Sequence, residues 1–471
     1  MLRYLLLLVF VSINLNTDCY SFDVKIEKTN QLTIHAKQID LQQILASLQL
    51  WGIIVKIDPQ INPIVSISFE NKDIQKGLDL LLKSFNHIYV WNTVKGPWGS
   101  MPVLSEIHVF YSGRKHHIRP LSQKNSFLMG HIPKTNDLYV KNELLIQLSR
   151  NVTIEKFLAF LNSIQASIVD SYPEISIYQI RFPPSVDALA YLDIFKKNEA
   201  ISSVEPNYGY SIPRIQKISP LKIASKESPL LKKSPSTKTS IAILDTGLQV
   251  NSELNKYVMS SYDTFNPKAD IQDNVGHGTN MANIASGNVL PEGSKNYGQA
   301  QSRYIVPIRI FDDKGFVSNA QIIKSIDFAE KSGAKILSMS WGSETYSKFL
   351  DQAMDFAVLR GMIPIAAAGN EPTGKPIYPA AYSSVIGVGA TSFDGSVWKQ
   401  SNYGDFVEIY APGYATFPKS ASNWPGRYVG TSISTAFVAN QVASYLESLS
   451  NMKHQKQYDV YKVIKKFGYE W

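Results

Sequence analysis

One stretch of the sequence combines a candidate nucleophile with the start of a helix. Ser432 comes two residues after Gly430 and precedes an apolar helix predicted over Phe437–Leu446. Backbone amides at a helix N-terminus point toward negative charge that develops beside them. A serine hydroxyl is a poor nucleophile until a base takes its proton, so this chemistry requires an imidazole within hydrogen-bond reach. For this stretch alone, a serine that only caps the helix is the alternative.

Three stretches upstream supply the remaining groups. Asp245 ends an uninterrupted apolar run, as a buried parallel strand ends at the mouth of a sheet. His277 opens a short helix between two glycines, and Asn370 follows a second apolar run. We expect His277 to be the general base, and Asp245 to fix its tautomer and stabilise the imidazolium. The Asn370 amide and the Ser432 backbone N–H would hold the oxyanion of a tetrahedral intermediate.

The elements that must position these groups follow from the hydrophobic pattern after Lys238. Short apolar runs alternate there with segments whose apolar residues recur at helical spacing. This rhythm predicts an α/β fold, a parallel sheet with helices on both faces, whose functional loops gather at the carboxyl edge of the strands. The expected strands are residues 305–310, 336–340, 363–368 and 385–388, and the expected helices are residues 320–331 and 349–359.

These motifs resemble the catalytic domain of the subtilisin-like serine proteases, which has the chain order Asp, His, Ser. The separations are 32 residues from Asp245 to His277, 93 from there to Asn370 and 62 from there to Ser432. The resemblance covers roughly residues 238–471. It implies a serine endopeptidase that hydrolyses peptide bonds through an acyl-enzyme on its serine. Further matching segments are Arg309–Gly315, Leu337–Gly342, Tyr378–Ala380, Ser401–Gly404 and Ala411–Gly413.

The same resemblance identifies a substrate-binding edge strand at Ser340, Trp341 and Gly342, where an extended peptide pairs by main-chain hydrogen bonds. Trp341 is bulkier than the residue often found there. We therefore expect its indole to narrow or stack a subsite and to favour apolar or aromatic substrate side chains. Three other positions depart from the family pattern without removing a proton or oxyanion donor: Ala436 stands where proline is usual, Asn280 where histidine is usual and Asn283 where glycine is usual.

This chemistry requires no metal and no other cofactor. Calcium has little support, because Gln249 stands where the family commonly has an acid and only Glu253 lies nearby. We predict no metal ligands, and calcium is the alternative. The pair His116-His117 has no carboxylate or cysteine at ligand spacing, so it does not predict a metal site either.

Residues 137–210 are predicted to form a small α+β unit with the order β-α-β-β-α-β. Its end, Val204–Tyr208, resembles the end of the inhibitor propeptide that precedes subtilisin-like catalytic domains, and the unit lies immediately upstream of one. The resemblance implies that this unit folds against the catalytic domain and lays its C-terminal end in the cleft. Its expected strands are residues 144–148, 168, 175–177, 179–182 and 201–206, and its expected helices are residues 154–161 and 186–195.

Residues 22–111 show a similar order of elements in a second α+β unit. The order resembles the short N-terminal domain of secretins and TonB-dependent receptors, which serves protein–protein contacts in the bacterial envelope. The resemblance implies an envelope protein partner for this module, and a folded spacer without a partner is the alternative. Its expected strands are residues 32–36, 53–57, 64–69, 88–91 and 107–111, and its expected helices are residues 41–48 and 74–82.

Two polar segments separate these units. Residues 112–136 have no strong periodicity and are predicted to be a linker. Residues 211–239 hold four prolines and, with seven Lys or Arg against one Glu, carry +6 of the formal net charge of +8. No aromatic residues are interleaved with these charges, which favours a solvated linker over a nucleic-acid interface. A propeptide would have to be cut in this segment, and the sequence does not select the bond.

The first 21 residues predict export. Arg3 is followed by a nearly continuous apolar run, Tyr4–Ile13, which is too short to span a bilayer and is typical of a secretory signal peptide. The polar residues before Cys19 argue against a lipid attachment there. Removal of the signal would leave no cysteine, so no disulfide would stabilise the mature protein in a periplasmic or extracellular destination. An uncleaved anchor is the alternative.

Together these patterns predict an exported serine endopeptidase, made as a self-processing precursor, whose catalytic domain spans residues 240–471. Its partners would be a polypeptide substrate and its own propeptide, not a nucleic acid. Two alternatives stay open. One is an envelope adaptor with a catalytically silent protease fold, against which the complete set of four catalytic residues argues. The other is a peptide ligase, in which a peptide amine rather than water resolves the acyl-enzyme.

Overall fold

The computed structural model describes residues 23–27, 31–49, 51–96, 99–121, 127–149, 152–212, 216–218, 239–249, 253–267, 269–294, 302–419, 422 and 424–450. The predicted signal peptide and most of the predicted basic linker lie outside these ranges. The chain divides into two compact units: one comprises residues up to Trp91 with Leu104–Leu121, and the other comprises Asn92–Val103 with everything from Ser122 onward. Within the described ranges, no helix has both the length and the apolar character to cross a membrane.

The first unit is built from two small sheets and two amphipathic helices. Its elements are β1 (Asp23–Glu27), β2 (Gln31–Asp40), α1 (Leu41–Gln49), β3 (Ile54–Ile57), β4 (Ile64–Asp73), α2 (Ile74–Leu81), the first part of β5 (Asn86–Gly96), the last part of β6 (Gly99–Phe110) and β7 (Arg119–Pro120). One sheet has the order β1-β2-β4, and the other has the order β5-β6-β3-β7 with β3 and β6 parallel. The apolar faces of α1 and α2, which include Leu45 and Leu78, are buried in one core, as their helical spacing predicts.

The segment of residues 112–136 is more than a linker. Strand β7 pairs with β3 of the first unit, whereas β8 (Met129–His131) pairs with the first long strand of the second unit. The turn before β7 is held by Arg114, whose Nε donates to Oδ2 of the fully buried Asp58 at 2.6 Å. The sequence did not reveal these strands, because pieces of two and three residues are too short for an alternating pattern to be recognised.

Residues 137–210 fold in the predicted order of strand, helix, two strands, helix and strand. The elements are β9 (Leu138–Leu148), α3 (Ile154–Ser163), β10 (Ser167–Tyr172), β11 (Ile177–Arg181), α4 (Leu192–Lys196) and β12 (Ile201–Ser211). The sheet order is β10-β11-β9-β12, with antiparallel neighbours throughout. Phe157, Leu161 and Phe195 from the two helices are fully buried in its core. Helix α4 begins later than expected, because a 3-10 turn at Ala188–Tyr191 precedes it.

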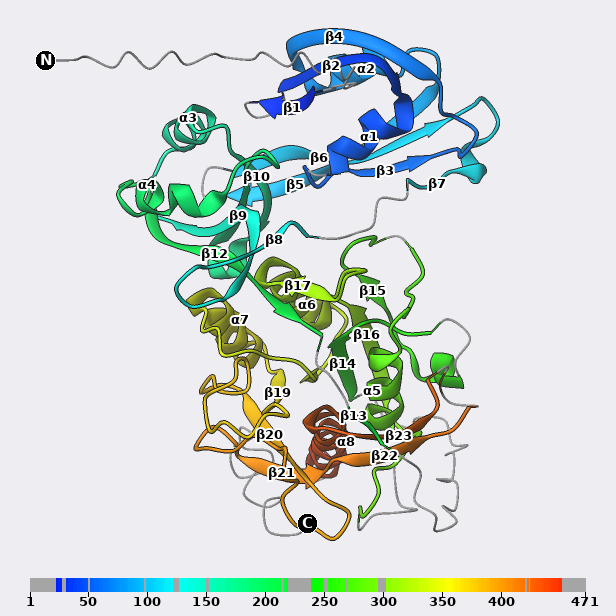
Figure 1. The fold of residues 1–471 in the computed structure, drawn as a ribbon, viewed down its shortest axis with the longest axis vertical. Coiled ribbons are helices and arrows are strands. Elements are labelled where there is room, and N and C mark those ends of the chain that lie inside the picture. Colours follow the sequence, from blue (N-terminus) through cyan, green and yellow to red (C-terminus); the bar gives the residue numbers. More distant parts are fainter. Residues whose placement is uncertain are drawn as a thin grey trace, which may run out of the picture. The chain divides into compact units, whose positions relative to one another are not determined.

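The rest of the second unit is organised around a seven-stranded parallel sheet (Figure 1). Its elements are β13 (Gln216–Ile218), β14 (Ser240–Asp245), β15 (Tyr262–Asp263), α5 (His277–Ala285), β16 (Tyr304–Arg309), β17 (Phe316–Ser318), α6 (Asn319–Lys331), β18 (Ile336–Met339), α7 (Lys348–Leu359), β19 (Ile363–Ala367), β20 (Ile386–Thr391), β21 (Ile409–Pro412), β22 (Tyr414–Phe417), β23 (Gly426–Val429) and α8 (Thr431–Ser450). The sheet order is β15-β16-β14-β18-β19-β20-β21, and all its neighbouring strands run parallel.

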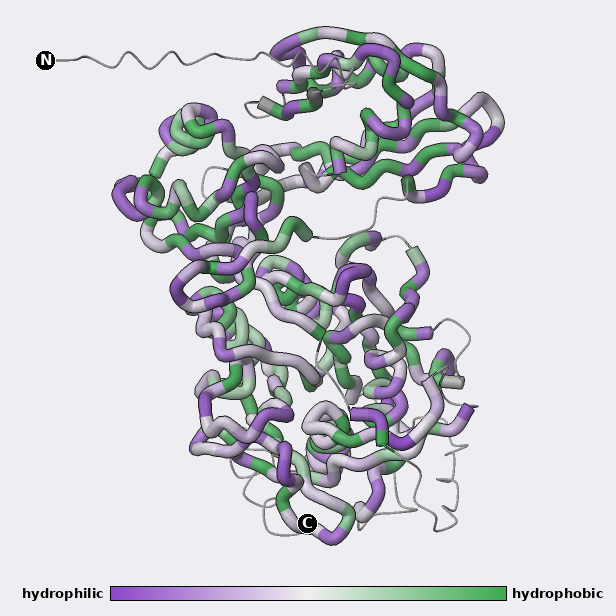
Figure 2. The backbone as a smooth tube through the Cα atoms, viewed as in Figure 1, coloured by the Kyte–Doolittle hydropathy of each residue, from purple (hydrophilic) through white to green (hydrophobic). Residues whose placement is uncertain are grey.

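Helices cover both faces of this sheet. Along the inner strand β14, Ile241 and Ile243 join a core that includes residues of α5 and α8. Their neighbours Ala242 and Leu244 join a second core that includes residues of α6 and α7. Figure 2 shows hydrophobic residues along the strands of the sheet and hydrophilic ones in many of the surface loops. This is the predicted subtilisin-like α/β architecture, in which both faces of the strands are buried.

Candidate active site

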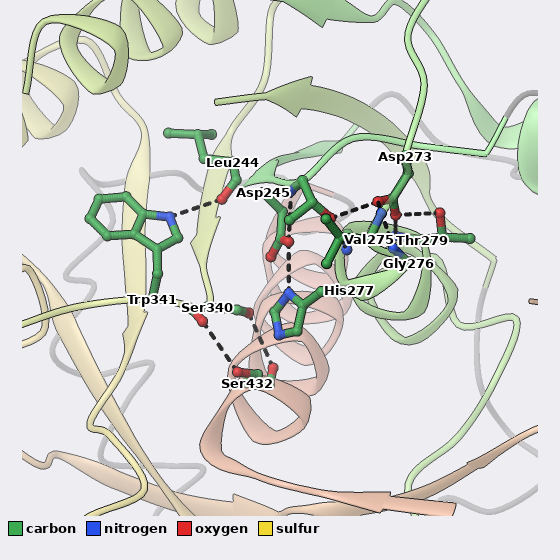
Figure 3. A network of polar contacts seen from close by, with 12 residues as sticks. Leu244, Asp245, Asp273, Val275, Gly276, His277, Thr279, Ser340, Trp341 and Ser432 are labelled. Carbon is green, nitrogen blue, oxygen red and sulfur yellow. Dashed lines mark hydrogen bonds and ion pairs between the residues drawn. The ribbon is translucent and has the colours of Figure 1, made fainter. Parts of the chain in front are cut away.

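Three side chains meet at the carboxyl edge of the parallel sheet. Asp245 is the last residue of β14, His277 is the first residue of α5, and Ser432 lies in the first turn of α8. Oδ1 of Asp245 and Nδ1 of His277 are 2.7 Å apart, and none of the three residues is more than 4% exposed. Figure 3 shows the imidazole between the carboxylate and the serine. Folding therefore brings the predicted nucleophile, base and orienting acid together.

The surroundings of His277 favour its protonated form. Burial lowers the pKa of His277, but the charge of Asp245, the hydrogen bond to Asp245 and the charge of Asp273 raise it by more, so this pKa lies above its ordinary value. The hydrogen bond at Nδ1 leaves Nε2 as the basic nitrogen of the neutral ring. Nε2 is buried and has no hydrogen-bond partner among the described residues. The ring is thus placed to accept a proton at Nε2.

The Ser432 hydroxyl is held beside this ring by the end of β18. It donates to the Ser340 carbonyl at 3.2 Å, and the Ser340 hydroxyl donates to the Ser432 carbonyl at 3.3 Å. The second ring nitrogen of His277 points toward Ser432 (Figure 3). Because a serine side chain has a single rotatable carbon–carbon bond, a change of rotamer turns the hydroxyl from Ser340 toward the imidazole.

Asn370 approaches the start of the same helix. Its Oδ1 accepts hydrogen bonds from the backbone N–H and from the hydroxyl of Thr431, both at 2.9 Å. With the oxygen held there, the amide nitrogen lies at the other end of the side chain and is the atom that can donate to a developing oxyanion. Gly369, with φ of +101°, provides the sharp backbone turn that places Asn370 after β19.

Asp273 is a functional candidate that the sequence patterns did not identify. Its Oδ1 accepts from the Thr246 hydroxyl and from two loop amides, and its Oδ2 accepts from the amide and hydroxyl of Thr279, all at 2.7–3.1 Å. The carboxylate thereby ties the loop that follows Asp245 to the first turn of the helix that carries His277. The available signal was an acidic residue just before a helix start, where it can accept otherwise unpaired amides.

In the predicted substrate-binding stretch, residues 340–342, the side chain of Trp341 is buried in the domain. The Trp341 indole is 1% exposed and donates to the Leu244 carbonyl at 2.9 Å, so it lies within the core and not across an open groove. Its ring centroid is 5.5 Å from that of Tyr210, which is fully buried. The indole therefore contacts an aromatic side chain of the inhibitor-like unit of the same chain, and the expected preference for apolar or aromatic substrate side chains stays a prediction. A side chain at Gly342 would meet the side chain of Ile377 and the backbone of Tyr378.

The inhibitor-like unit ends along one side of this site. Strand β12 pairs antiparallel with β17, with Tyr210 opposite Val317. One step further, the N–H of Ile212 donates to the Gly315 carbonyl at 2.9 Å. An extended segment of the chain thus occupies a strand edge close to Trp341, which is the residue after Ser340.

A second segment of the chain, strand β13, pairs with the strand that precedes Ser432. Strand β13 pairs antiparallel with β23, and Gln216 lies opposite Val429. Strand β23 leads directly into Ser432 and helix α8. Ile212 and Gln216 are only four residues apart, a separation that an extended chain covers in at most about 14 Å. Ile212 and Gln216 therefore lie within about 14 Å of each other, and β23 continues into the turn that carries Ser432.

Acidic side chains of the catalytic domain have protein partners. In the described ranges, no cluster of three or more His, Cys, Asp or Glu side chains is arranged to hold a metal ion. Asp312 is buried and accepts hydrogen bonds from three backbone amides, those of Phe127, Lys314 and Phe316. The exposed loop residue Asp394 accepts from the amide and hydroxyl of Ser396. These contacts give both carboxylates a structural role.

The three departures from the family pattern are accommodated inside the domain. Asn280, Asn283 and Ala436 are all buried. The Asn283 amide donates to the Thr279 carbonyl at 2.9 Å, and its Oδ1 accepts from Asn288 at 2.7 Å. The helix that carries His277 is therefore held by internal polar contacts.

Comparison with known proteins identifies the class to which this fold and site belong. The model of the subtilase family matches residues 236–465, and the model of the fervidolysin N-terminal prodomain matches residues 131–207. The chain belongs to the subtilase family and is a serine endopeptidase that carries a prodomain. Neither match includes residues 22–111, so the likeness of that module to secretin and TonB-receptor domains stays a prediction.

Individual relatives agree with this assignment. Thermitase from Thermoactinomyces vulgaris is 34% identical over 220 residues, which are 45% of this chain and 77% of thermitase. A thermophilic serine proteinase from Bacillus sp. (strain AK1) is 27% identical over 315 residues, which are 65% of this chain and 78% of that protein. The crystal structure of fervidolysin from Fervidobacterium pennivorans matches with a TM-score of 0.54 and 21% identity, over 70% of this chain and 58% of fervidolysin. That structural likeness supports the fold alone.

Proposed function

We propose that this subtilase is an exported endopeptidase made as a precursor that cuts itself, with Ser432 as the nucleophile. The observation that carries the proposal is the buried Asp245–His277 pair, whose second ring nitrogen faces a serine at a helix start. Two extended segments of the chain itself, one paired with β17 and one paired with β23, would give the site its first substrate.

Acylation would begin when Ser432 attacks a peptide carbonyl carbon while Nε2 of His277 takes the hydroxyl proton. The tetrahedral intermediate collapses, the C–N bond breaks, and the imidazolium gives its proton to the leaving amine. Water then attacks the ester in the same way, which releases the acid product and restores the serine. Asp245 would stabilise the imidazolium in both halves through the 2.7 Å contact with Nδ1.

The negative charge of each intermediate would be held by the Ser432 backbone N–H and the Asn370 amide. Loss of one such side-chain donor in a related protease costs about 2.7–4 kcal/mol. We therefore expect Asn370→Ala to lower kcat by roughly 10²–10³-fold with a much smaller change in KM. Peptide hydrolysis by the processed protein measures this directly, and an unchanged kcat would remove Asn370 from the mechanism.

The inhibitor-like unit would serve both as a folding template and as an inhibitor. Glu205 accepts hydrogen bonds from the Lys348 and Phe349 amides at the start of α7, at 2.8 and 3.4 Å. Asn207 accepts one from the Ala320 amide at the start of α6, at 3.1 Å. The first amides of a helix have no partner inside the helix, so the unit completes two helices of the catalytic domain. Side chains of this unit also join the core beneath those helices.

Self-cleavage would fall among the four peptide bonds that join Ile212 to Gln216. The residues before this stretch are bound to β17, and the residues after it are bound to β23, which leads into Ser432. A cut here separates the inhibitor-like unit from the catalytic domain without breaking either pairing. The basic segment in which a cut was expected begins at this point.

The silent adaptor and the ligase make different predictions. A fluorophosphonate should label the processed protein at Ser432, and absence of labelling would favour the adaptor. The variant Ser434→Ala is a matched control, because Ser434 lies in the same helix turn but donates to the Ala411 carbonyl instead. Product mass spectrometry with added amine nucleophiles separates hydrolysis from ligation, because a ligase joins the amine to the acyl fragment.

We also propose export by residues 1–21 and a docking role for the module of residues 22–111. Fractionation of cells that produce the protein tests export, and retention of the processed enzyme in the cytoplasm would contradict it. Deletion of the module should leave peptide hydrolysis intact and change only the location or partners of the protein. A loss of peptide hydrolysis on deletion would contradict a docking role.

A further inference from the structure

Strand β13 lies between the two family matches and takes the position of the leaving part of a substrate. Its three residues pair with β23 (Figure 1), while the residues before the proposed cut pair with β17. We propose that this side of the cleft is a recognition site for a basic side chain followed by an aliphatic one, with Tyr428 and Gly426 forming the basic subsite. The inference rests on the proposed function, since it takes β13 as a bound substrate segment.

The side chain of Lys217 shows what the basic subsite accepts. Lys217 lies directly opposite Tyr428 in the strand register, and its Nζ is 5.8 Å from the centroid of that ring. An ammonium group over an aromatic face is attracted by the ring electrons. A Cβ placed on Gly426 would lie 3.0 Å from Cε of Lys217, so the missing side chain leaves room for the lysine stem.

The ring that forms this subsite is fixed, and the neighbouring cation is already paired. Tyr428 is 7% exposed, and its ring packs against Phe417 with centroids 6.0 Å apart. Arg427 donates to both carboxylate oxygens of Glu292 at 2.5–2.9 Å. Burial raises the pKa of Glu292, but the hydrogen bonds from Arg427 and Thr416 lower it by more, so the carboxylate stays ionised. A substrate lysine therefore does not meet an unpaired positive charge on β23.

The next side chain of β13 explains the aliphatic preference. Successive residues of a strand point to opposite faces, so Ile218 faces away from the Tyr428 ring. Ile218 is half-buried against an apolar cluster. The cluster consists of Ala390, Trp398, Val429 and Tyr414. A lysine or arginine at this position would lose hydration beside the cluster and would lie opposite the Arg427 cation.

The substrates of this site are therefore polypeptides whose leaving segment carries a lysine and then an aliphatic residue. The test uses the processed wild-type enzyme and fluorogenic peptides with the sequence of Gly209–Ser219, in which Lys217 is kept or replaced by norleucine or glutamate. Norleucine keeps the aliphatic stem and removes the charge. Because an exposed cation–π contact contributes about 0.5–1 kcal/mol, we expect kcat/KM to be roughly two- to five-fold higher for lysine than for norleucine, and lowest for glutamate.

Two enzyme variants assign the preference to Tyr428. In Tyr428→Leu the ratio of kcat/KM between the lysine and norleucine peptides should fall to about one. Tyr304→Leu is the control, because Tyr304 begins β16, at the end of the sheet opposite the site, and the ratio should persist there. Strand β13 stays attached to the processed enzyme and competes with both peptides for the same site. This competition lowers both values of kcat/KM by the same factor, so it does not affect their ratio.

Equal hydrolysis of the three peptides by the wild-type enzyme overturns the inference, and so does an unchanged ratio in Tyr428→Leu. The wild-type series alone decides the question if that variant does not fold. Mass spectrometry of the products must also place the cut between the positions of Ile212 and Gln216, and a cut elsewhere overturns the inference. If no peptide is hydrolysed and a fluorophosphonate fails to label Ser432, the proposed function fails and the inference falls with it.

Discussion

Strands β12 and β13, which precede and follow the proposed cut, are held with very different strength. On the β12 side Tyr210 is fully buried, and β12 belongs to a larger sheet whose side chains share a core with α6 and α7. On the β13 side, Gln216 and Lys217 are exposed, and three residues pair with a single neighbouring strand. Burial of apolar surface is the main favourable contribution to such association, so the β12 side is held far more tightly.

This difference gives maturation a direction. After the proposed cut, the segment on the acyl side would remain bound as an inhibitor, whereas the leaving segment on β23 would depart readily. When the new amine leaves, water can reach the acyl-enzyme ester. The departed amine is then less able to return and attack the ester. Hydrolysis rather than ligation is therefore the expected outcome, and removal of the prodomain is the slow step toward free protease.

The largest expected effect is a weaker association of the prodomain on the β12 side. Replacement of Tyr210 by alanine removes a fully buried aromatic ring next to Trp341. Such a change costs about 3 kcal/mol, so the processed prodomain should dissociate at roughly 100-fold higher protein concentration. Ser211→Ala is the control, because the adjacent side chain is exposed. Protease activity during dilution of the processed complex gives the measurement, and equal curves for the two variants would contradict the account.

The second prediction concerns the catalytic step itself and not the binding of the prodomain. In Asp273→Asn, the carboxylate that accepts hydrogen bonds from Thr246 and Thr279 loses its charge. We expect kcat to fall roughly 10- to 100-fold, because one charged hydrogen-bond acceptor contributes about 1.5–3 kcal/mol. The charge of Asp273 raises the pKa of His277, so its removal lowers that pKa.

The pH profile identifies this role for Asp273. Protonated His277 cannot act as a base, so the acid limb of kcat/KM should move to lower pH in Asp273→Asn. A merely structural loss would reduce kcat without moving the limb. In Asp273→Glu, which keeps the charge, the wild-type position of the limb should return. An acid limb that is unchanged in Asp273→Asn would exclude an electrostatic role.

The third prediction concerns the pH dependence of prodomain binding. Burial raises the pKa of Glu205, and hydrogen bonds from Ser347, Lys348 and Phe349 only partly offset this, so the bound prodomain favours the protonated carboxyl. The contribution of Glu205 to prodomain binding is fully present below the ordinary pKa of glutamate. It is lost as the pH rises through the raised pKa of Glu205 in the bound state. The wild-type prodomain should therefore be released more easily at neutral than at acid pH.

The variant Glu205→Gln should flatten this dependence, because it has no titrating group. Measurement of prodomain release from pH 4 to 8 in both proteins decides the matter. A steeper dependence in the glutamine variant would show that the sign is wrong.

The smallest effect concerns the weakly held side. Lys217→Glu in the full-length chain removes the ammonium over the Tyr428 ring and should slow precursor processing by roughly two- to five-fold. Gln216→Glu changes the charge of the same strand by one unit without touching that ring, and it serves as the control. The time course of precursor loss on gels measures both. Slower processing in the control than in Lys217→Glu would assign the effect to charge alone.

The sequence predicted what depends on long patterns and distinctive neighbours. The continuous apolar run of β14 predicted a buried parallel strand, and glycines beside His277 and Ser432 indicated loops and helix starts. The paired apolar positions of α1, α2 and α3 placed those helices. These features are local, so residue type and spacing are sufficient to recognise them.

The remaining features depend on partners far away in the sequence. Strands β7, β8 and β13 are two or three residues long and form only because another strand presents an edge to them. The role of Asp273 depends on backbone amides, which every residue type carries. The contact between Tyr210 and Trp341 joins two units that local patterns describe separately.

The central claim is that Ser432 cuts the chain that lies beside it. Intact-mass analysis of the purified wild type and of Ser432→Ala, produced in the same way, tests this claim most directly. We expect two wild-type fragments whose junction lies between Ile212 and Gln216, and a single uncut chain for the variant. Cleavage of Ser432→Ala at the same bond and at the wild-type rate would contradict it.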